Sequence, residues 1–233
     1  AVEVQGGTLS ITAGYLGGNQ ASTRGGAICV GKNSGKVTVN GKDAVIACNL
    51  SGVQAGAIYV YAGGTLDFTK GRIASNSAGN GGAIYAYGGC KVVIGDSEAV
   101  DRSVVSETIL TDNTARGQGG AIFMYPATPT VQVYGAAIVG NESIEGGGVR
   151  VGDNNANGGL FTISHSVVSY NSATNGGGIR FDKAKATTLD DVSIHHNTAS
   201  GMGGGIWLNS TALTMDDAEI FQNSARNDGG GVW

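Results

Sequence analysis

A short phrase that recurs eight times constrains this chain more than any other feature. In its clearest copy, Asn197 is followed by a small hydroxylated residue, a glycine-rich corner and the apolar Ile206. The recurring asparagines are Asn19, Asn49, Asn76, Asn113, Asn141, Asn171, Asn197 and Asn223. Each phrase closes eight or nine residues later on an aliphatic residue: Ile28, Ile58, Ile84, Ile122, Val149, Ile179, Ile206 and Val232. A fixed short spacing within a longer variable interval is typical of a solenoid.

Each repeat also holds three short runs in which apolar residues alternate with other residues. The first run follows the glycines, as at 58–61. The second run comes next along the chain, as at 37–39. The third run leads into the asparagine and carries an apolar anchor three residues before it, such as Ile73. Alternation with period two over three to five residues predicts half-buried strands, and no segment has a helical period. We therefore predict an all-β fold. It is a right-handed parallel β-helix of about eight coils with three strands each, the handedness following the usual crossover rule.

The repeated residues have structural explanations within such a coil. The asparagines should stack from coil to coil as a ladder of side-chain amides. The glycines should permit a positive φ and a close approach at the corner, where a side chain would clash. The apolar residues should form columns inside the coil. None of these roles needs a ligand.

Composition narrows the class of protein. The chain has 42 glycines, only 2 prolines and 41% hydrophobic residues in regular short runs, which argues against a disordered linker. A formal net charge of −4 argues against a nucleic-acid partner. No apolar run approaches the roughly 20 residues of a membrane span, so we expect no direct membrane insertion.

Metal and cofactor sites are not expected either. The three cysteines, Cys29, Cys48 and Cys90, fit no metal-binding spacing and cannot all pair, so we expect small buried or half-buried thiols. The three histidines are too scattered for a metal site. We predict one repeat domain over 1–233, and because the chain stops just as a strand should begin, we expect it to be part of a longer protein. An insertion around 96–107 should loop away from the coils, and a smaller one at 152–159 should lengthen the turn after the fifth phrase.

The repeat resembles that of the chlamydial polymorphic outer membrane proteins and similar adhesin-like β-helix proteins. Their short motifs are GGA followed by an aliphatic residue, and FxxN. The first stands here as Gly25-Gly-Ala-Ile28, Gly81-Gly-Ala-Ile84 and Gly119-Gly-Ala-Ile122, and drifts to Gly-Gly-Gly in later copies. The second has an aliphatic residue in place of Phe nearly everywhere, as in Ile73-Ala-Ser-Asn76. The resemblance implies a secreted or cell-surface passenger that mediates adhesion, with a glycan or protein of a host or neighbouring cell as partner.

The best candidate site is the residue just after each closing aliphatic, which alternation predicts to point outward. This column reads Cys29, Tyr59, Tyr85, Phe123, Arg150, Arg180, Trp207 and Trp233. Two residues further on, a parallel column includes Tyr61, Tyr87, Tyr125 and Asp182. One interpretation is that stacked aromatic side chains stabilise neighbouring strands. The other is an exposed aromatic strip that binds sugar rings or a protein.

Two alternatives to an adhesin remain open. Arg150, Arg180 and Asp182 form a charged group beside the strip, and polysaccharide lyases or glycoside hydrolases of the pectate-lyase-like β-helix type use such groups. We nevertheless expect a protein that is not an enzyme. The second alternative is head-to-tail self-association into fibres, because neither Ala1 nor Trp233 lies in a polar cap that would cover the end strands.

Overall fold

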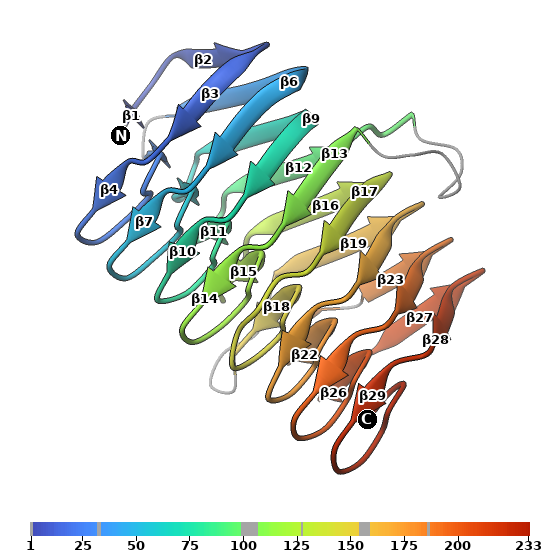
Figure 1. Ribbon diagram of the computed structural model, residues 1–233. Coiled ribbons are helices and arrows are strands. Elements are labelled where there is room, and N and C mark those ends of the chain that lie inside the picture. The colour runs from blue at the N-terminus through green and yellow to red at the C-terminus, as the bar shows by residue number, and fades with distance from the viewer. Residues whose placement is uncertain (1, 32–33, 99–106, 127, 154–158, 186) are drawn as a thin grey trace.

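The computed structural model describes residues 2–31, 34–98, 107–126, 128–153, 159–185 and 187–233. These residues form strands and turns without a helix, and the chain winds right-handed through stacked coils (Figure 1). The predicted parallel β-helix is therefore confirmed. The eight asparagines bound seven intervals, so the solenoid has about seven complete turns rather than the eight expected. The described part of the chain contains no helix, and therefore none that is long and apolar enough to cross a membrane.

One sheet, which we call sheet A, is built from β1 and the seven strands that follow glycine corners. Its eight strands lie in the order β1-β5-β8-β11-β15-β18-β22-β26. The parallel register places each closing aliphatic on the next, as in Ile28↔Ile58 and Ile84↔Ile122. The strands are β1 (Val2–Val4), β5 (Ile28–Val30), β8 (Ile58–Val60), β11 (Ile84–Ala86), β15 (Ile122–Met124), β18 (Val149–Gly152), β22 (Ile179–Asp182) and β26 (Ile206–Asn209).

A larger sheet, sheet B, contains the second and third runs of every repeat in 14 strands. In two coils these runs merge into the long strands β6 and β9, which join the two halves of the sheet. The strands are β2 (Thr8–Ile11), β3 (Gly14–Gly17), β6 (Lys36–Ala47), β9 (Thr65–Ala74), β12 (Lys91–Gly95), β13 (Thr108–Thr111), β16 (Thr130–Tyr134), β17 (Ala136–Val139), β19 (Leu160–Ser164), β20 (Val167–Ser169), β23 (Thr187–Asp190), β24 (Ser193–His195), β27 (Leu213–Asp216) and β28 (Glu219–Phe221).

A third row of strands, the C ladder, follows the asparagines. Its strands have only two residues each, too short for an alternating pattern to reveal them in the sequence. They are β4 (Gln20–Ala21), β7 (Leu50–Ser51), β10 (Ser77–Ala78), β14 (Thr114–Ala115), β21 (Ser172–Ala173), β25 (Thr198–Ala199) and β29 (Ser224–Ala225). Glu142 bridges Thr114 to Ser172, so the row continues across the coil between β14 and β21.

The predicted asparagine ladder is confirmed from Asn19 to Asn223. In all seven steps the side-chain Nδ2 donates a hydrogen bond of 2.9–3.0 Å to Oδ1 of the next asparagine. The backbone N–H of Asn113 also donates to Oδ1 of Asn141 at 2.9 Å, and Nδ2 of Asn113 donates to the carbonyl of the anchor Ile73 at 3.1 Å. The buried amides thus satisfy one another and the turn backbone, which holds the coils in register.

Two of the corners have a positive φ in all eight repeats. At the predicted glycine corner φ lies between 57° and 67°, and Ala55 is the one residue there that is not glycine. The second corner, immediately before the asparagine, was not predicted, because in six coils its residue is not glycine. This corner is made by Gly18, Cys48, Ser75, Asp112, Gly140, Tyr170, His196 and Gln222.

The interior of the coil is filled by the predicted apolar columns. Closing aliphatics such as Ile58, sheet B residues such as Phe68 and anchors such as Ile73 have no exposed surface. The two predicted insertions fall mostly on residues 99–106 and 154–158, which lie outside the described part of the chain.

Candidate binding surfaces

From Tyr59 to Trp207 the column just after each closing aliphatic is buried, so the prediction that it is exposed was wrong for these residues; Cys29 is half-buried and Trp233 is 44% exposed. Tyr59, Tyr85 and Phe123 are 1–2% exposed. They point away from the interior of the coil, as alternation predicts, but the glycine corner of the same repeat folds back over them. A Cβ added at Gly119 would lie only 2.8 Å from the Cβ of Phe123. The glycines therefore bring the loop close enough to cover the outer face of sheet A.

The N-terminal half of this buried column is aromatic. The ring centroids of Tyr59 and Tyr85 are 5.3 Å apart in a stacked arrangement, and Tyr85 meets Phe123 edge-on at 5.1 Å. With Ala55 these residues form a second hydrophobic cluster outside the coil. Burial raises the pKa of the Tyr59 and Tyr85 hydroxyls far above its ordinary value of 10.0. This half of the column therefore stabilises the fold, the first of the two interpretations.

The C-terminal half of the column is ionic. Oδ2 of Asp182 accepts hydrogen bonds from Nη1 of Arg150 and from Nε of Arg180, the latter at 2.8 Å. Oδ1 of Asp182 accepts a third from Nδ2 of Asn209 at 3.0 Å. Arg150 and Asp182 have no exposed surface, and Arg180 is 5% exposed. One buried carboxylate thus holds two guanidinium groups from adjacent coils.

Two further side chains complete this ionic cluster. Glu145, in the covering loop, pairs with Nη1 of Arg180 at 3.4 Å and with Nη2 of Arg150 at 3.5 Å. The guanidinium of Arg180 lies 3.6 Å from the ring centroid of Trp207, a cation–π contact. Burial, together with the charge of Arg180, lowers the pKa of Arg150. Two acidic and two basic groups balance within the cluster.

Burial and internal pairing also decide what this cluster can do chemically. A lyase or hydrolase needs carboxylate or basic groups that reach a sugar. Here Asp182 and Arg150 are sealed from solvent and bonded to each other. The candidate residues Arg150, Arg180, Asp182 and Trp207 are therefore brought together, but as a structural cluster rather than an accessible site.

The second predicted column remains partly accessible over three coils. Tyr61, Tyr87 and Tyr125 are half-buried. Their ring centroids are 5.2 and 5.6 Å apart along the solenoid, and successive rings are tilted by 29° and 27°. We call these three residues the tyrosine ladder. Because each ring turns its face toward the next, the ladder presents mainly ring edges and hydroxyl groups to solvent.

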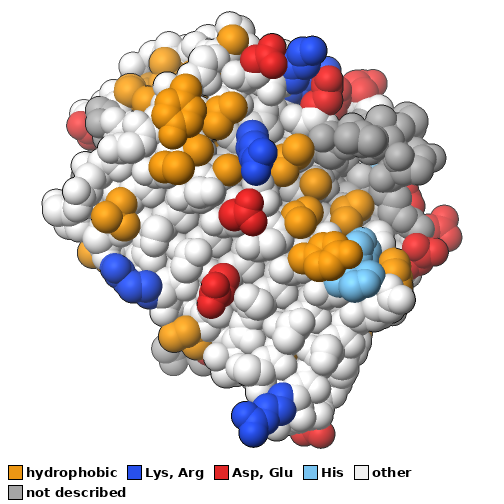
Figure 2. All heavy atoms as spheres, in the orientation of Figure 1, with side chains coloured by type: hydrophobic (Ala, Val, Ile, Leu, Met, Phe, Trp, Pro, Cys, Tyr) orange, Lys and Arg blue, Asp and Glu red, His pale blue; other side chains and the backbone are white. Residues whose placement is uncertain are grey.

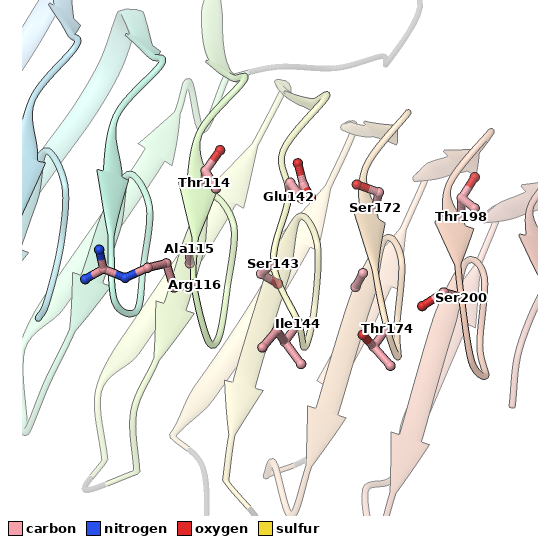
Figure 3. A pocket seen from close by; sticks show the side chains of 11 residues that line it. Thr114, Ala115, Arg116, Glu142, Ser143, Ile144, Ser172, Thr174, Thr198 and Ser200 are labelled. Atoms are coloured by element: carbon pink, nitrogen blue, oxygen red, sulfur yellow. The ribbon is translucent and has the colours of Figure 1, made fainter.

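A groove runs along the C ladder, on elements other than those of the tyrosine ladder. It has a volume of about 560 Å³ and crosses four coils (Figure 3). Its lining residues are Thr114, Ala115, Arg116, Glu142, Ser143, Ile144, Ser172, Ala173, Thr174, Thr198 and Ser200. This groove was not predicted from the sequence. The available signal was the run of polar residues one position after successive asparagines and, except at Ile144, three positions after them.

The cysteines and histidines form no metal centre in the part of the chain that the structure describes. All three cysteines are free, Cys90 buried, Cys29 half-buried and Cys48 exposed, so the thiol at Cys48 departs from the expected burial. Nδ1 of His165 lies 3.0 Å from Oδ2 of Asp191. His195 and His196 lie beside each other with their Nδ1 atoms 2.8 Å apart.

Comparison with known proteins supports the resemblance of the repeat. Residues 107–124 match the Chlamydia polymorphic membrane protein repeat. This stretch contains the anchor Leu110, the ladder residue Asn113 and the corner Gly119-Gly-Ala-Ile122. No curated protein and no solved structure shows a significant match. The match covers one copy of the repeat and shows that this copy is similar to the repeat of that family.

Proposed function

We propose that this chain is an adhesin-like passenger domain of a cell-surface or secreted protein, and that it binds a protein partner through the tyrosine ladder. The observation that supports this most is the Chlamydia polymorphic membrane protein repeat within a parallel β-solenoid. A stiff stack of coils displays side chains at a regular spacing, which suits a domain that presents a binding surface away from a cell.

The geometry of the ladder favours a protein over a sugar ring. A sugar that stacks on an aromatic side chain needs an open ring face, and Tyr61, Tyr87 and Tyr125 turn their faces toward one another. Ring edges and hydroxyl groups offer apolar area and hydrogen bonds together, which is why tyrosine is enriched at protein interfaces. A glycan bound at the ladder is the competing version of this function.

A cell-binding assay tests this proposal. Beads coated with the chain are counted on cultured epithelial cells, and the variant Tyr61→Ala/Tyr87→Ala/Tyr125→Ala should bind at least tenfold less. The matched control is Tyr15→Ala/Tyr170→Ala, which removes two highly exposed tyrosines from other positions. Protease treatment of the cells should abolish binding and glycosidase treatment should not. Undiminished binding by the triple variant would overturn the proposal.

A further inference from the structure

We infer that the groove along the C ladder is a binding site for a neutral glycan of about three sugar units. The site lies on elements different from the tyrosine ladder, and it does not depend on the protein partner proposed above.

Two parallel rows of side chains flank a floor of small residues in this groove (Figure 3). Strand pairing and isolated bridges stack Thr114 on Glu142, Glu142 on Ser172, and Ser172 on Thr198. The second row lies two residues further along each coil: Arg116, Ile144, Thr174 and Ser200. Neighbouring parallel strands are about 4.8 Å apart, close to the length of one sugar unit in an extended glycan, so three coil-to-coil steps accommodate about three units.

The hydroxyl groups of both rows are available to a ligand. Within the described residues, Thr114, Ser172, Thr174, Thr198 and Ser200 donate no side-chain hydrogen bond to the protein and accept none from it. In the floor, by contrast, Oγ of Ser143 donates to the carbonyls of Glu145 and Gly146 at 2.9 and 3.0 Å. Rows of uncommitted hydroxyl groups match the donors and acceptors of sugar hydroxyls.

The groove also offers an apolar contact. The side chain of Ile144 is 52% exposed, and Ala115 and Ala173 lie in the floor beside it. The C–H face of a sugar can rest on these side chains while its hydroxyl groups reach the two rows. A ligand with one apolar face and a polar rim fits this lining better than a fully polar peptide does.

The charged side chains at the groove favour a neutral ligand over an acidic one. Arg116 turns away from the groove, and its Nη2 donates to the carbonyl of Gly52 at 2.8 Å. Glu142 is exposed and has no ion-pair partner among the described residues, so it is the one charge directed along the rows. Its carboxylate can accept two sugar hydroxyls and would repel a uronic or sialic acid. The face in Figure 2 likewise carries its charged side chains mostly far apart on an uncharged surface.

Saturation-transfer NMR followed by calorimetry on the intact chain tests this inference. The neutral probes are cellotriose, maltotriose and triacetylchitotriose, and the acidic probes are trigalacturonic acid and sialyllactose. At least one neutral probe should bind and the acidic probes should not. Glu142→Ala should weaken binding at least tenfold, and Thr198→Ala about threefold. Asp216→Ala, an equal change of charge on the exposed end of β27, should leave binding unchanged.

Three results would overturn the inference: no neutral probe binds at millimolar concentration, only acidic probes bind, or Glu142→Ala binds as tightly as the unaltered chain. Loss of sugar binding in Tyr87→Ala with full binding in Glu142→Ala would move the glycan to the tyrosine ladder. That outcome would contradict this groove without contradicting adhesion. Conversely, cell binding that survives the triple tyrosine variant leaves the groove inference intact.

Discussion

The two halves of the buried column on sheet A occupy equivalent positions, but their buried side chains are stabilised by different interactions. From Tyr59 to Phe123 the column is filled by aromatic rings packed on one another. From Arg150 to Trp207 it is filled by two guanidinium groups and an indole, and the carboxylate of Asp182 binds both guanidinium groups from the neighbouring second column. The backbone is the same in both halves, with the glycine corner folded over the outer face of the sheet.

The difference teaches that the cover, rather than the side chain beneath it, is the constant feature of the repeat. The asparagine ladder and the corner glycines set the distance between loop and sheet. The side chain below is then shielded from water and is held by apolar contact in one half and by ion pairs in the other. In the ionic half Nε of Arg150 and Nε1 of Trp207 are buried without a hydrogen-bond partner among the described residues. The two halves should therefore lose stability in different ways when their buried side chains are substituted.

The largest expected effect is in the ionic half. Asp182→Ala leaves two buried guanidinium groups without their shared acceptor and should destabilise the chain by about 3–5 kcal/mol. Urea unfolding followed by circular dichroism measures the loss. Asp190→Ala, at the accessible end of β23, is the matched control and should change stability by less than about 0.5 kcal/mol. Equal losses in the two variants would contradict the buried ion cluster.

The aromatic half should respond to a change of volume rather than of charge. Tyr85→Ala removes a ring that is 2% exposed and should cost about 3 kcal/mol, while Tyr87→Ala, in the half-exposed column, should cost about 1 kcal/mol or less. The same urea experiment compares them. A larger loss for Tyr87→Ala than for Tyr85→Ala would reverse the assignment of the two columns.

Alkali should separate the halves as well. The folded pKa of Tyr59 and Tyr85 is raised above the ordinary value of 10.0 because burial disfavours the phenolate. The stability that these hydroxyls contribute is therefore complete below pH 10 and is lost as the pH rises above it, by up to about 1.4 kcal/mol per pH unit for each tyrosine. Unfolding midpoints between pH 9 and 11 should fall more steeply for the unaltered chain than for Tyr59→Phe/Tyr85→Phe.

The smallest expected effect is the same in both halves. Ser75, in a coil of the aromatic half, and Gln222, in a coil next to the ionic half, are exposed residues with φ of 55° and 51°. Replacing either by glycine should stabilise the chain by up to about 1 kcal/mol, because the left-handed conformation strains other residues. Thermal unfolding should show similar gains for Ser75→Gly and Gln222→Gly, and none for Ser75→Ala. A gain in only one half would mean that the corners are not equivalent.

The sequence carried the fold but not the accessible surface. Fixed spacing from Asn113 to Ile122 and its counterparts predicted coils, ladder and glycine corner, because these depend on local period and on residues that must stack. Alternation also placed Tyr85 outside the coil. Alternation could not show that the loop covers Tyr85, because it reports only which face of a strand a side chain lies on and not what packs over that face. The strands of the C ladder have only two residues each, which is too short to show an alternating pattern in the sequence. The groove beside Glu142, which lies along these strands, could therefore not be predicted.

Tyrosine nitration mapped by mass spectrometry tests most directly whether the column after the closing aliphatics is a covered second core. Tyr15 and Tyr170, which are 66% and 58% exposed, should react fastest, and Tyr61, Tyr87 and Tyr125 more slowly. Tyr59 and Tyr85 should react only when the chain unfolds. Nitration of Tyr59 and Tyr85 in the folded chain at the rate of Tyr15 would contradict a covered column and would support an exposed aromatic strip instead.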